Sequence, residues 1–295
     1  DCRTVAGGPN CAGRLPHPRG AQTLCCHTCG HRPPSPTVCP AAKCRNPAIR
    51  YAGLGTENVE ATLGKLFPHA AIRRMDSDAL KRKDDFRRIL GDFRTGKIDI
   101  LVGTQMIAKG LHFPNVTLVG IIYADLSLHM PDFRAGERTF QLLTQVAGRA
   151  GRGDVEGEVF VQAFSPFHPA IQYARRHDFA GFYEQEIEFR QQLKYPPMSR
   201  VALLTLKDRN EEKVRLSAQH LRGELEKALT GWKDLVIAGP APAPLSRAES
   251  HYRHQIMLRT QSMSRLSKVL ARVVDEVQLP DGVSLSVDID PVDLS

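Results

Sequence analysis

The sequence predicts an α/β fold built on a parallel sheet, preceded by a cysteine-rich module and followed by an α+β domain. Strand and helix patterns alternate between about residues 53 and 164, all seven cysteines lie within the first 44 residues, and the order of elements changes after residue 195. Alternating strands and helices form crossover units, which give a parallel sheet with helices on its faces. We therefore expect three parts, at residues 1–50, 51–195 and 196–295.

The central part owes its predicted elements to hydrophobic spacing. The run Ile-Asp-Ile-Leu-Val at residues 98–102 suits a strand that is buried on both faces. Thr56 stands at the expected N-cap of the first helix, directly before the acidic Glu57. The predicted helices are 57–67, 84–94 and 137–150, and the predicted strands are 71–75, 98–102, 116–123 and 157–164.

The last part has a different order of elements. Tyr195, Pro196 and Pro197 break any helix and mark a domain border. The order beyond them is βαββαβ, as in a ferredoxin-like domain. Strands are predicted at 200–207, 235–238, 255–260 and 284–289, helices at 210–229 and 262–277, and a proline-rich loop at 239–244.

Charge is unevenly distributed along the chain, whose formal net charge is +8. Residues 1–50 carry seven Lys or Arg and one acidic residue, which indicates an anionic partner for the cysteine-rich module. No run of about 18 apolar residues exists, so no membrane span is expected. The chain starts without methionine or a signal-peptide core, and we expect it to be a fragment of a longer protein.

The cysteines are spaced for metal binding. Cys26 and Cys29 form one close pair and Cys39 and Cys44 another, and two such pairs can offer four thiolates to a tetrahedral zinc ion. A cluster followed by a cysteine-free body is not typical of a secreted disulfide protein, so a reducing cytosol is expected. Alternatives remain open: Cys25 can replace Cys26, three histidines are spare nitrogen ligands, and two cysteines suggest a second, incomplete set (His17, His27, His31; Cys2, Cys11).

A pair of arginines marks the predicted end of the helix 137–150. Arg149 and Arg152, three residues apart, would share one helix face beside Gly148, and two guanidinium groups can clamp a polyphosphate. The alternative is a solvated basic face. Because each glycine inside a helix costs about 1 kcal/mol relative to alanine, Gly148 and Gly151 favour close approach by a ligand or by another backbone segment.

The loop that follows the strand 98–102 is a second candidate site. Thr104 lies at the carboxyl end of this strand, where α/β sheets bind ligands, and its hydroxyl can donate to a nucleic-acid phosphate. Lys109 and Gly110, further along the loop, can face a nucleotide. By contrast, residues 91–98 match the phosphate-loop spacing only in part, because Ile98 replaces the required Ser or Thr. We interpret Gly96 there as a helix stop.

Residues 103–110 and 145–152 resemble motifs V and VI of superfamily 2 helicases. The chain as a whole resembles the C-terminal half of the PriA family (primosomal protein N′), the replication-restart helicases of bacteria. The resemblance implies a zinc-binding insertion, a RecA-like helicase lobe 2 and a C-terminal domain. The runs that carry it are residues 26–30, 55–57, 100–106, 131–135, 145–152, 195–197, 252–256 and 287–291.

This resemblance implies an ATP-dependent 3′–5′ DNA helicase that recognises stalled or branched forks and assembles the primosome. Arg149 and Arg152 would reach the β/γ-phosphates of ATP with Mg²⁺, one of them as an arginine finger, and Gln145 would orient the phosphates or the attacking water. Nucleotide binding would involve Lys109, Gly110 and Gly148, and DNA binding Thr104 and Gln105. The chain lacks the phosphate loop of lobe 1, so it should be inactive alone. The alternative is a non-catalytic, zinc-containing DNA-binding or scaffold module.

The resemblance also implies two zinc ions with interleaved ligands. One site would take Cys2, Cys39 and Cys44, and the other Cys11, Cys26 and Cys29; the fourth ligand of the second would fall at Gly8, which cannot bind metal. One or two zinc ions are therefore expected. The implied partners are forked or single-stranded DNA, single-stranded-DNA-binding protein and helicase-loading proteins, for a monomer in the bacterial cytoplasm, associated with the nucleoid.

Overall fold

The computed structural model describes residues 6–8, 11–14, 34, 36–38, 55–76, 83–108, 115–148, 150 and 156–294. The chain divides into two compact units. The central unit comprises Tyr51–Met130 and Arg134–Glu184, and the C-terminal unit comprises Asp1–Arg50, Pro131–Phe133 and Gln185–Ser295.

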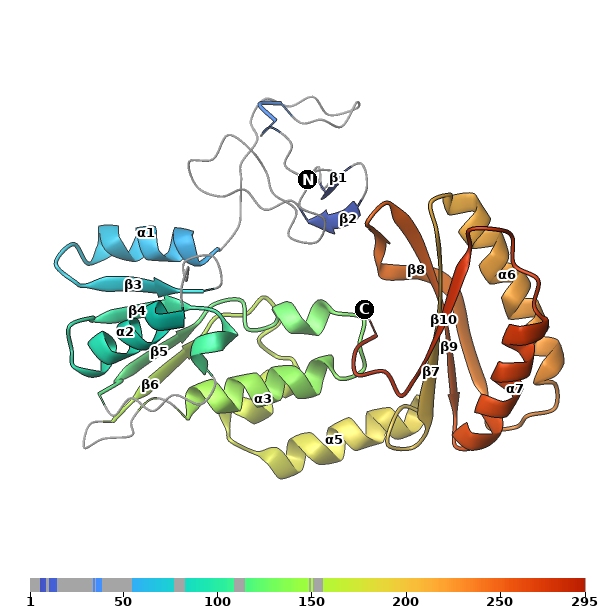
Figure 1. Cartoon of the computed structure of the whole chain (residues 1–295). Helices are drawn as coiled ribbons and strands as arrows, with labels where there is room; N and C mark the ends of the chain where they lie inside the picture. Colours follow the sequence, from blue (N-terminus) through green and yellow to red (C-terminus); the bar gives the residue numbers. More distant parts are fainter. Residues whose placement is uncertain are drawn as a thin grey trace. The chain divides into compact units, whose positions relative to one another are not determined.

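The central unit alternates helices and strands (Figure 1). Its strands form two parallel ladders, β3 with β4 and β5 with β6, each joined across a helix, as parallel strands require. In the part of the chain described, no ladder joins the two pairs, so the single sheet expected from the sequence is present as two. The elements are α1 (Thr56–Leu66), β3 (Ile72–Met75), α2 (Lys83–Arg94), β4 (Ile100–Gly103), η1 (Gln105–Ala108), β5 (Leu118–Ile121), η2 (Leu126–His129), α3 (Ala135–Ala147), β6 (Glu158–Val161), α4 (Pro169–Arg175) and α5 (Phe179–Gln192), the last of which continues into the C-terminal unit.

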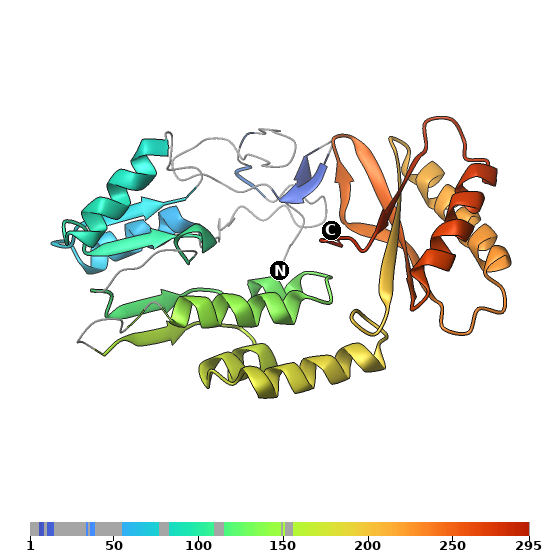
Figure 2. The same cartoon turned by 60° about the horizontal axis from the view of Figure 1, so that its bottom comes forward.

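Helix α3 is held by a buried aromatic cluster. Phe140 of α3 stacks on Phe182 of α5, with ring centroids 4.3 Å apart and planes 1° from parallel. Leu143 of α3 and Ile171 of α4 are buried in the same cluster. Burial of this one face fixes the rotation of α3 about its own axis, and Figure 2 shows α3 beside α5.

The start of α1 differs from the expectation. Thr56 was predicted as the N-cap, but α1 begins at Thr56 and Gly55 occupies the cap position without a side-chain bond. The Thr56 hydroxyl donates to the carboxylate of Asp76, 20 residues away, so this side chain is directed towards the end of β3, and no side-chain oxygen accepts from the first N–H groups of α1.

The end of α3 also differs from the expectation. The helix was predicted to run to residue 150, but it ends at Ala147, and Gly148 is its C-cap, with its N–H donating to the carbonyl of Thr144 at 3.1 Å. Glycine is the poorest helix former after proline, so a stop here is reasonable. Arg149 and Arg152 lie outside the described residues, so the prediction that they share one helix face stays a prediction.

The interpretation of Gly96 as a helix stop is confirmed. Gly96 has φ +76°, which favours glycine, and its N–H donates to the carbonyl of Phe93. The N–H of Lys97 donates to the carbonyl of Asp92 at 2.9 Å, completing a Schellman motif after α2. A strand follows, so these residues do not form a phosphate loop.

Helices α4 and α5 were missed by the sequence reasoning. A signal was present at α4, because Pro169 stands at its first turn, where proline is favoured, and His168 caps it by accepting from the N–H of Ala170 at 3.2 Å.

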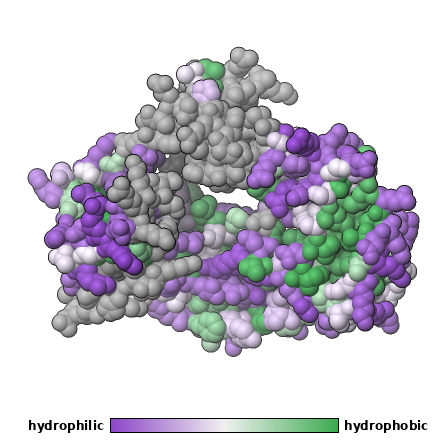
Figure 3. All heavy atoms as spheres, viewed as in Figure 1, coloured by the Kyte–Doolittle hydropathy of each residue, from purple (hydrophilic) through white to green (hydrophobic). Residues whose placement is uncertain are grey.

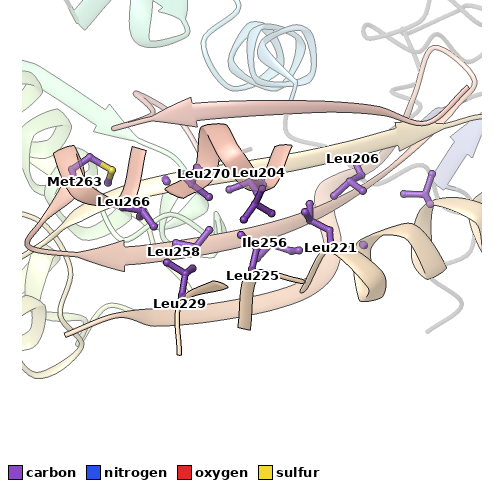
Figure 4. Close-up of a cluster of buried hydrophobic side chains, with 14 residues drawn as sticks. Leu204, Leu206, Leu221, Leu225, Leu229, Ile256, Leu258, Met263, Leu266 and Leu270 are labelled. Carbon is purple, nitrogen blue, oxygen red and sulfur yellow. The ribbon is translucent and has the colours of Figure 1, made fainter. Parts of the chain in front are cut away.

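The C-terminal unit is built on a four-stranded antiparallel sheet with strand order β10-β7-β9-β8. Alternate residues of β7 face opposite sides, so Leu204 and Leu206 contact the helices while Val201 and Leu203 face away. Both helices cover one face of the sheet and bury their apolar stripes there, as the side chains in Figure 4 show. The elements are β7 (Arg200–Asp208), α6 (Glu211–Ala228), β8 (Val236–Ala248), β9 (His251–Thr260), α7 (Met263–Glu276) and β10 (Ser284–Ile289), with a separate short pair, β1 (Ala6–Gly8) and β2 (Cys11–Arg14).

The proline-rich segment 239–244 is not a loop, contrary to the prediction. It lies inside β8, where Ala241 pairs with Gln255 and Pro242 with His254. The strand tolerates its prolines because it lies at the edge of the sheet and its register shifts between Ala238 and Ala241, so the missing N–H groups break no inner ladder.

Among the helices that the structure describes, none has the length and apolar character needed to cross a bilayer. Figure 3 shows hydrophilic residues over much of the visible surface near α1 and hydrophobic residues gathered over part of the C-terminal unit.

Candidate nucleotide and nucleic-acid site

The carboxyl ends of β3 and β4 lie together, because Met75 pairs with Gly103 in the parallel register. Thr104 and Gln105 follow immediately and are exposed to solvent. The carbonyl of Thr104 accepts from the N–H of Ile107 at 3.1 Å, which starts the tight turn η1. Thr104 and Gln105 are thus available to a ligand at the edge of the ladder where the sequence predicted them.

Gly103 allows this turn to approach β3 closely. A Cβ atom at this position would lie 2.4 Å from the carbonyl oxygen of Met75 and 3.0 Å from Cγ2 of Ile107. Real Cβ atoms do not approach a backbone oxygen this closely, so any side chain would push the turn away from β3. The lack of a side chain at Gly103 therefore sets the position of Thr104.

Replacing Gly103 with alanine is expected to destabilise the chain by about 1–3 kcal/mol, the usual cost of overpacking. It should also displace Thr104, which follows Gly103 directly. The matched control is Gly120→Ala in β5, where an added Cβ meets nothing within 4 Å. Denaturant unfolding of both variants checks this, and equal unfolding midpoints of the two would contradict it.

An ion-pair cluster beside this turn was missed by the sequence reasoning. Asp76, which is 5% exposed at the end of β3, accepts from the hydroxyl of Thr56, and its Oδ2 lies 3.4 Å from Nε of Arg74. Nη1 of Arg74 lies 3.8 Å from Oε2 of Glu57. The cluster joins the start of α1 to the end of β3. A signal existed, because Asp76 directly follows the predicted strand 71–75, at the end where parallel strands place ligands.

The last turn of α3 carries the other described candidates. Gln145 and Gly148 are half-buried there, and the hydroxyl of Thr144 is engaged with the carbonyl of Phe140 at 2.8 Å. Gln145 is thus held by a helix whose opposite face is buried in the aromatic cluster.

Several predicted site residues fall outside the described part of the chain: Arg149, Arg152, Lys109, Gly110, Cys2, Cys26, Cys29, Cys39 and Cys44. Cys11 lies in β2, of which the backbone is described. Among the described residues no group of three His, Cys, Asp or Glu side chains could hold a metal ion.

Two described groups with displaced pKa values are structural parts of the C-terminal unit. The pKa of Asp234 is lowered, first by the backbone N–H of Gln261 and further by Thr260 and Trp232, all of which donate to its carboxylate. The pKa of His254 is lowered by burial against α6, a shift that the charge of Glu211 opposes. Asp234 ties Trp232 to the end of β9, and His254 is buried within the C-terminal unit, so both groups belong to the packing of that unit.

Known protein families match this chain in two places. Residues 55–154 match the family described as "Helicase conserved C-terminal domain", and residues 191–292 match the family described as "Primosomal protein N C-terminal domain". The Replication restart protein PriA of Bacillus subtilis (strain 168) is 42% identical over 294 residues, which cover 99% of this chain and 36% of that protein. The chain belongs to the PriA family.

Other PriA proteins are similar over the same extent. That of Synechocystis is 38% identical over 297 residues, covering 99% of this chain and 35% of that protein. That of Treponema pallidum is 39% identical over 284 residues, covering 96% of this chain and 42% of that protein. The chain is a C-terminal portion of a PriA-family protein and spans less than half the length of these relatives. A solved structure, the de novo designed protein Foldit4, is 12% identical with a TM-score of 0.26, too low to bear on the fold.

Proposed function

We propose that this chain forms the second lobe, the zinc-binding insertion and the C-terminal domain of an ATP-driven 3′–5′ DNA helicase that restarts replication at stalled or branched forks. The observation that carries the proposal is the order of the two family matches, in which a helicase domain precedes a primosomal one. The name "Replication restart protein", which the relatives share, supports the same role.

The proposed nucleotide contacts follow from charge and geometry. Arg149 and Arg152 would bind the β/γ-phosphates of ATP, with Gln145 orienting the phosphates or the attacking water, and Lys109, Gly110 and Gly148 near the nucleotide. Guanidinium groups suit this role because their donors match phosphate oxygens in pairs. Support comes from Gln145, in the last turn of a helix that is buried along its other side.

The proposed DNA contacts are Thr104 and Gln105. Both are exposed, and both follow a glycine whose close packing on β3 limits their movement. A hydroxyl and an amide can each donate to a phosphate without reading the base, which is what a motor moving along any sequence needs.

The cysteine-rich module is proposed to bind one or two zinc ions through Cys2, Cys11, Cys26, Cys29, Cys39 and Cys44. The donor set fits, because thiolates are preferred zinc ligands in a structural site. Bound zinc would stabilise the folded state of this basic module and would take no part in catalysis. Zinc-to-protein stoichiometry measures the number of ions, and a metal-free folded protein would contradict the proposal.

The C-terminal domain is proposed to be ferredoxin-like and to meet DNA and primosome partners. Its strand order, β10-β7-β9-β8, and the two helices on one face support this arrangement. We include single-stranded-DNA-binding protein among the proposed partners.

The 295-residue chain is expected to bind DNA but to hydrolyse no ATP, because it contains no complete phosphate loop. Its DNA affinity should fall steeply between low and moderate salt, since basic side chains that neutralise phosphates release counterions. Fluorescence anisotropy and a phosphate-release assay measure both properties. The full protein should show DNA-stimulated hydrolysis and 3′–5′ unwinding of forked DNA.

Two outcomes would change this assignment. DNA-stimulated ATP hydrolysis by the chain alone would contradict the proposal that hydrolysis needs both lobes. A full protein that binds forks and primosome proteins without any ATP hydrolysis would favour the scaffold function.

A further inference from the structure

Two aromatic rings and two guanidinium groups form a stack in the C-terminal unit. The ring of Phe133 stacks on that of Tyr195, with centroids 5.0 Å apart and planes inclined by 15°. The guanidinium of Arg190 lies over the Phe133 ring, 5.2 Å from its centroid. The guanidinium of Arg259 lies 4.3 Å from the Tyr195 centroid, so a cation contacts each ring.

The two arginines are held in place by further bonds. Nε of Arg190 donates to Oε1 of Glu186 at 2.9 Å, and its Nη1 donates to the carbonyl of Pro196 at 3.3 Å. Nη1 of Arg259 donates to the carbonyl of Leu193. These partners stop both guanidinium groups from swinging away, so the rings between them are confined.

Phe133 also packs against the face of the sheet that the helices leave uncovered. Its partners there are Val201 and Leu203 of β7, Met257 of β9 and Leu294 near the end of the chain. Val201 and Leu294 are 1% and 3% exposed, so this contact is a dry one. Phe133 is thus anchored in the C-terminal unit by both stacking and burial.

Phe133 lies where the chain passes between the two units, directly before α3. Pro131–Phe133 belong to the C-terminal unit, whereas Met130 before them and Arg134 after them belong to the central unit. Helix α3 begins at Ala135, two residues after Phe133. The covalent chain therefore enters α3 directly from a residue that the C-terminal unit holds.

Helix α3 can carry a displacement from one end to the other. Its 13 residues span about 20 Å at 1.5 Å per residue, and Gln145 lies in its last turn. Its inner face is packed, with Thr139, Phe140 and Leu143 all buried, so it moves as one body.

We propose that the Arg190–Phe133–Tyr195–Arg259 stack is a positioning device, through which the C-terminal domain sets the placement of α3, and hence of Gln145, when DNA stimulates ATP hydrolysis. Phe133 touches neither ATP nor DNA in this view and acts only through α3. The proposal rests on the proposed ATP-driven function. A purely structural clamp is the competing explanation, and the two differ in how DNA stimulation responds.

The test uses the full protein that carries this chain, with Phe133→Leu, which keeps apolar volume but removes the ring, and Phe133→Tyr, which keeps the stack. Phe133→Leu should lower the DNA-stimulated kcat about tenfold, in line with the effect of small misplacements at a reacting centre. KM for ATP, DNA affinity and the slow DNA-free rate should stay within about twofold, because the phosphates are bound mainly elsewhere. Phe133→Tyr should retain the wild-type rate.

The matched control is Tyr252→Leu. Tyr252 is also stacked by an arginine, with Arg247 4.5 Å from its centroid, but it lies within β9, far along the chain from α3. This variant should keep the wild-type ratio of DNA-stimulated to DNA-free hydrolysis. If Phe133→Leu impairs folding, Tyr195→Met removes the same stack from its other side and should give the same loss of DNA stimulation.

The outcomes separate this inference from the proposed function. A wild-type protein without DNA-stimulated hydrolysis would remove the proposed function itself. An active wild type with unaltered stimulation in Phe133→Leu and Tyr195→Met would overturn only the positioning role. Equal losses of the DNA-stimulated and DNA-free rates would also overturn it, because they indicate a general structural defect.

Discussion

Replacing Arg152 with alanine in the full protein should lower the DNA-stimulated kcat for ATP hydrolysis by about 10³-fold or more, while DNA affinity stays near that of the wild type. An arginine that stabilises charge on a transferring phosphoryl group is worth roughly 10³–10⁵ in rate. Such a contact acts mainly in the transition state, so kcat should fall much more than KM rises. Steady-state hydrolysis with saturating DNA measures the first value, and anisotropy titration measures the second.

Two further variants sharpen the Arg152 experiment. Arg152→Lys keeps the charge but not the planar fork of donors, and should rescue little of the rate. Arg88→Ala is the matched control, because Arg88 lies on α2 with its side chain 72% exposed and paired with Asp85 at 3.0 Å. Turnover that is unchanged in Arg152→Ala would remove this residue from the catalytic role.

Replacing Leu221 with alanine should destabilise the C-terminal sheet domain by about 3 kcal/mol, through lost apolar burial and the cavity left behind. Leu221 is fully buried at the centre of the cluster between α6, α7 and the sheet (Figure 4). For a domain of this size the midpoint of thermal unfolding should fall by roughly 15 °C.

The same helix supplies the control for Leu221. Leu216 of α6 is 51% exposed, and Leu216→Ala should change stability by less than about 0.5 kcal/mol. Trp232 is the one tryptophan of the chain and packs against this cluster, so its fluorescence reports the unfolding of this domain. Equal unfolding midpoints for the two variants would mean that Leu221 is not a core residue.

Much of the secondary structure could be predicted from local pattern. The strand predicted at 200–207 is β7 (Arg200–Asp208), and the helix predicted at 262–277 is α7 (Met263–Glu276). Both signals are strong, because β7 is a nearly continuous apolar run and α7 repeats apolar residues at helical spacing. The helix stop at Gly96 could be predicted equally well, since glycine adopts a positive φ without strain.

The errors came where a distant residue changed the local preference. Segment 239–244 looked like a loop because of its prolines, yet pairing with β9 made it an edge strand. Thr56 looked like an N-cap, yet it lies inside α1 and its hydroxyl donates to the carboxylate of Asp76. The end of α3 has a local cause instead: the helix was predicted to reach residue 150, and it ends at Ala147 with Gly148 as its C-cap.

The sequence by itself determined the family and which residue types are candidates for phosphate, DNA and zinc, because motif spacing and residue chemistry are local properties. Only the tertiary structure decided that Gly103 lies against Met75, that Asp76 holds Thr56, and that Phe133 is stacked against Tyr195. The physical reason is that each of these contacts joins residues far apart in the chain. Their energies depend on packing and burial that arise only when the elements come together.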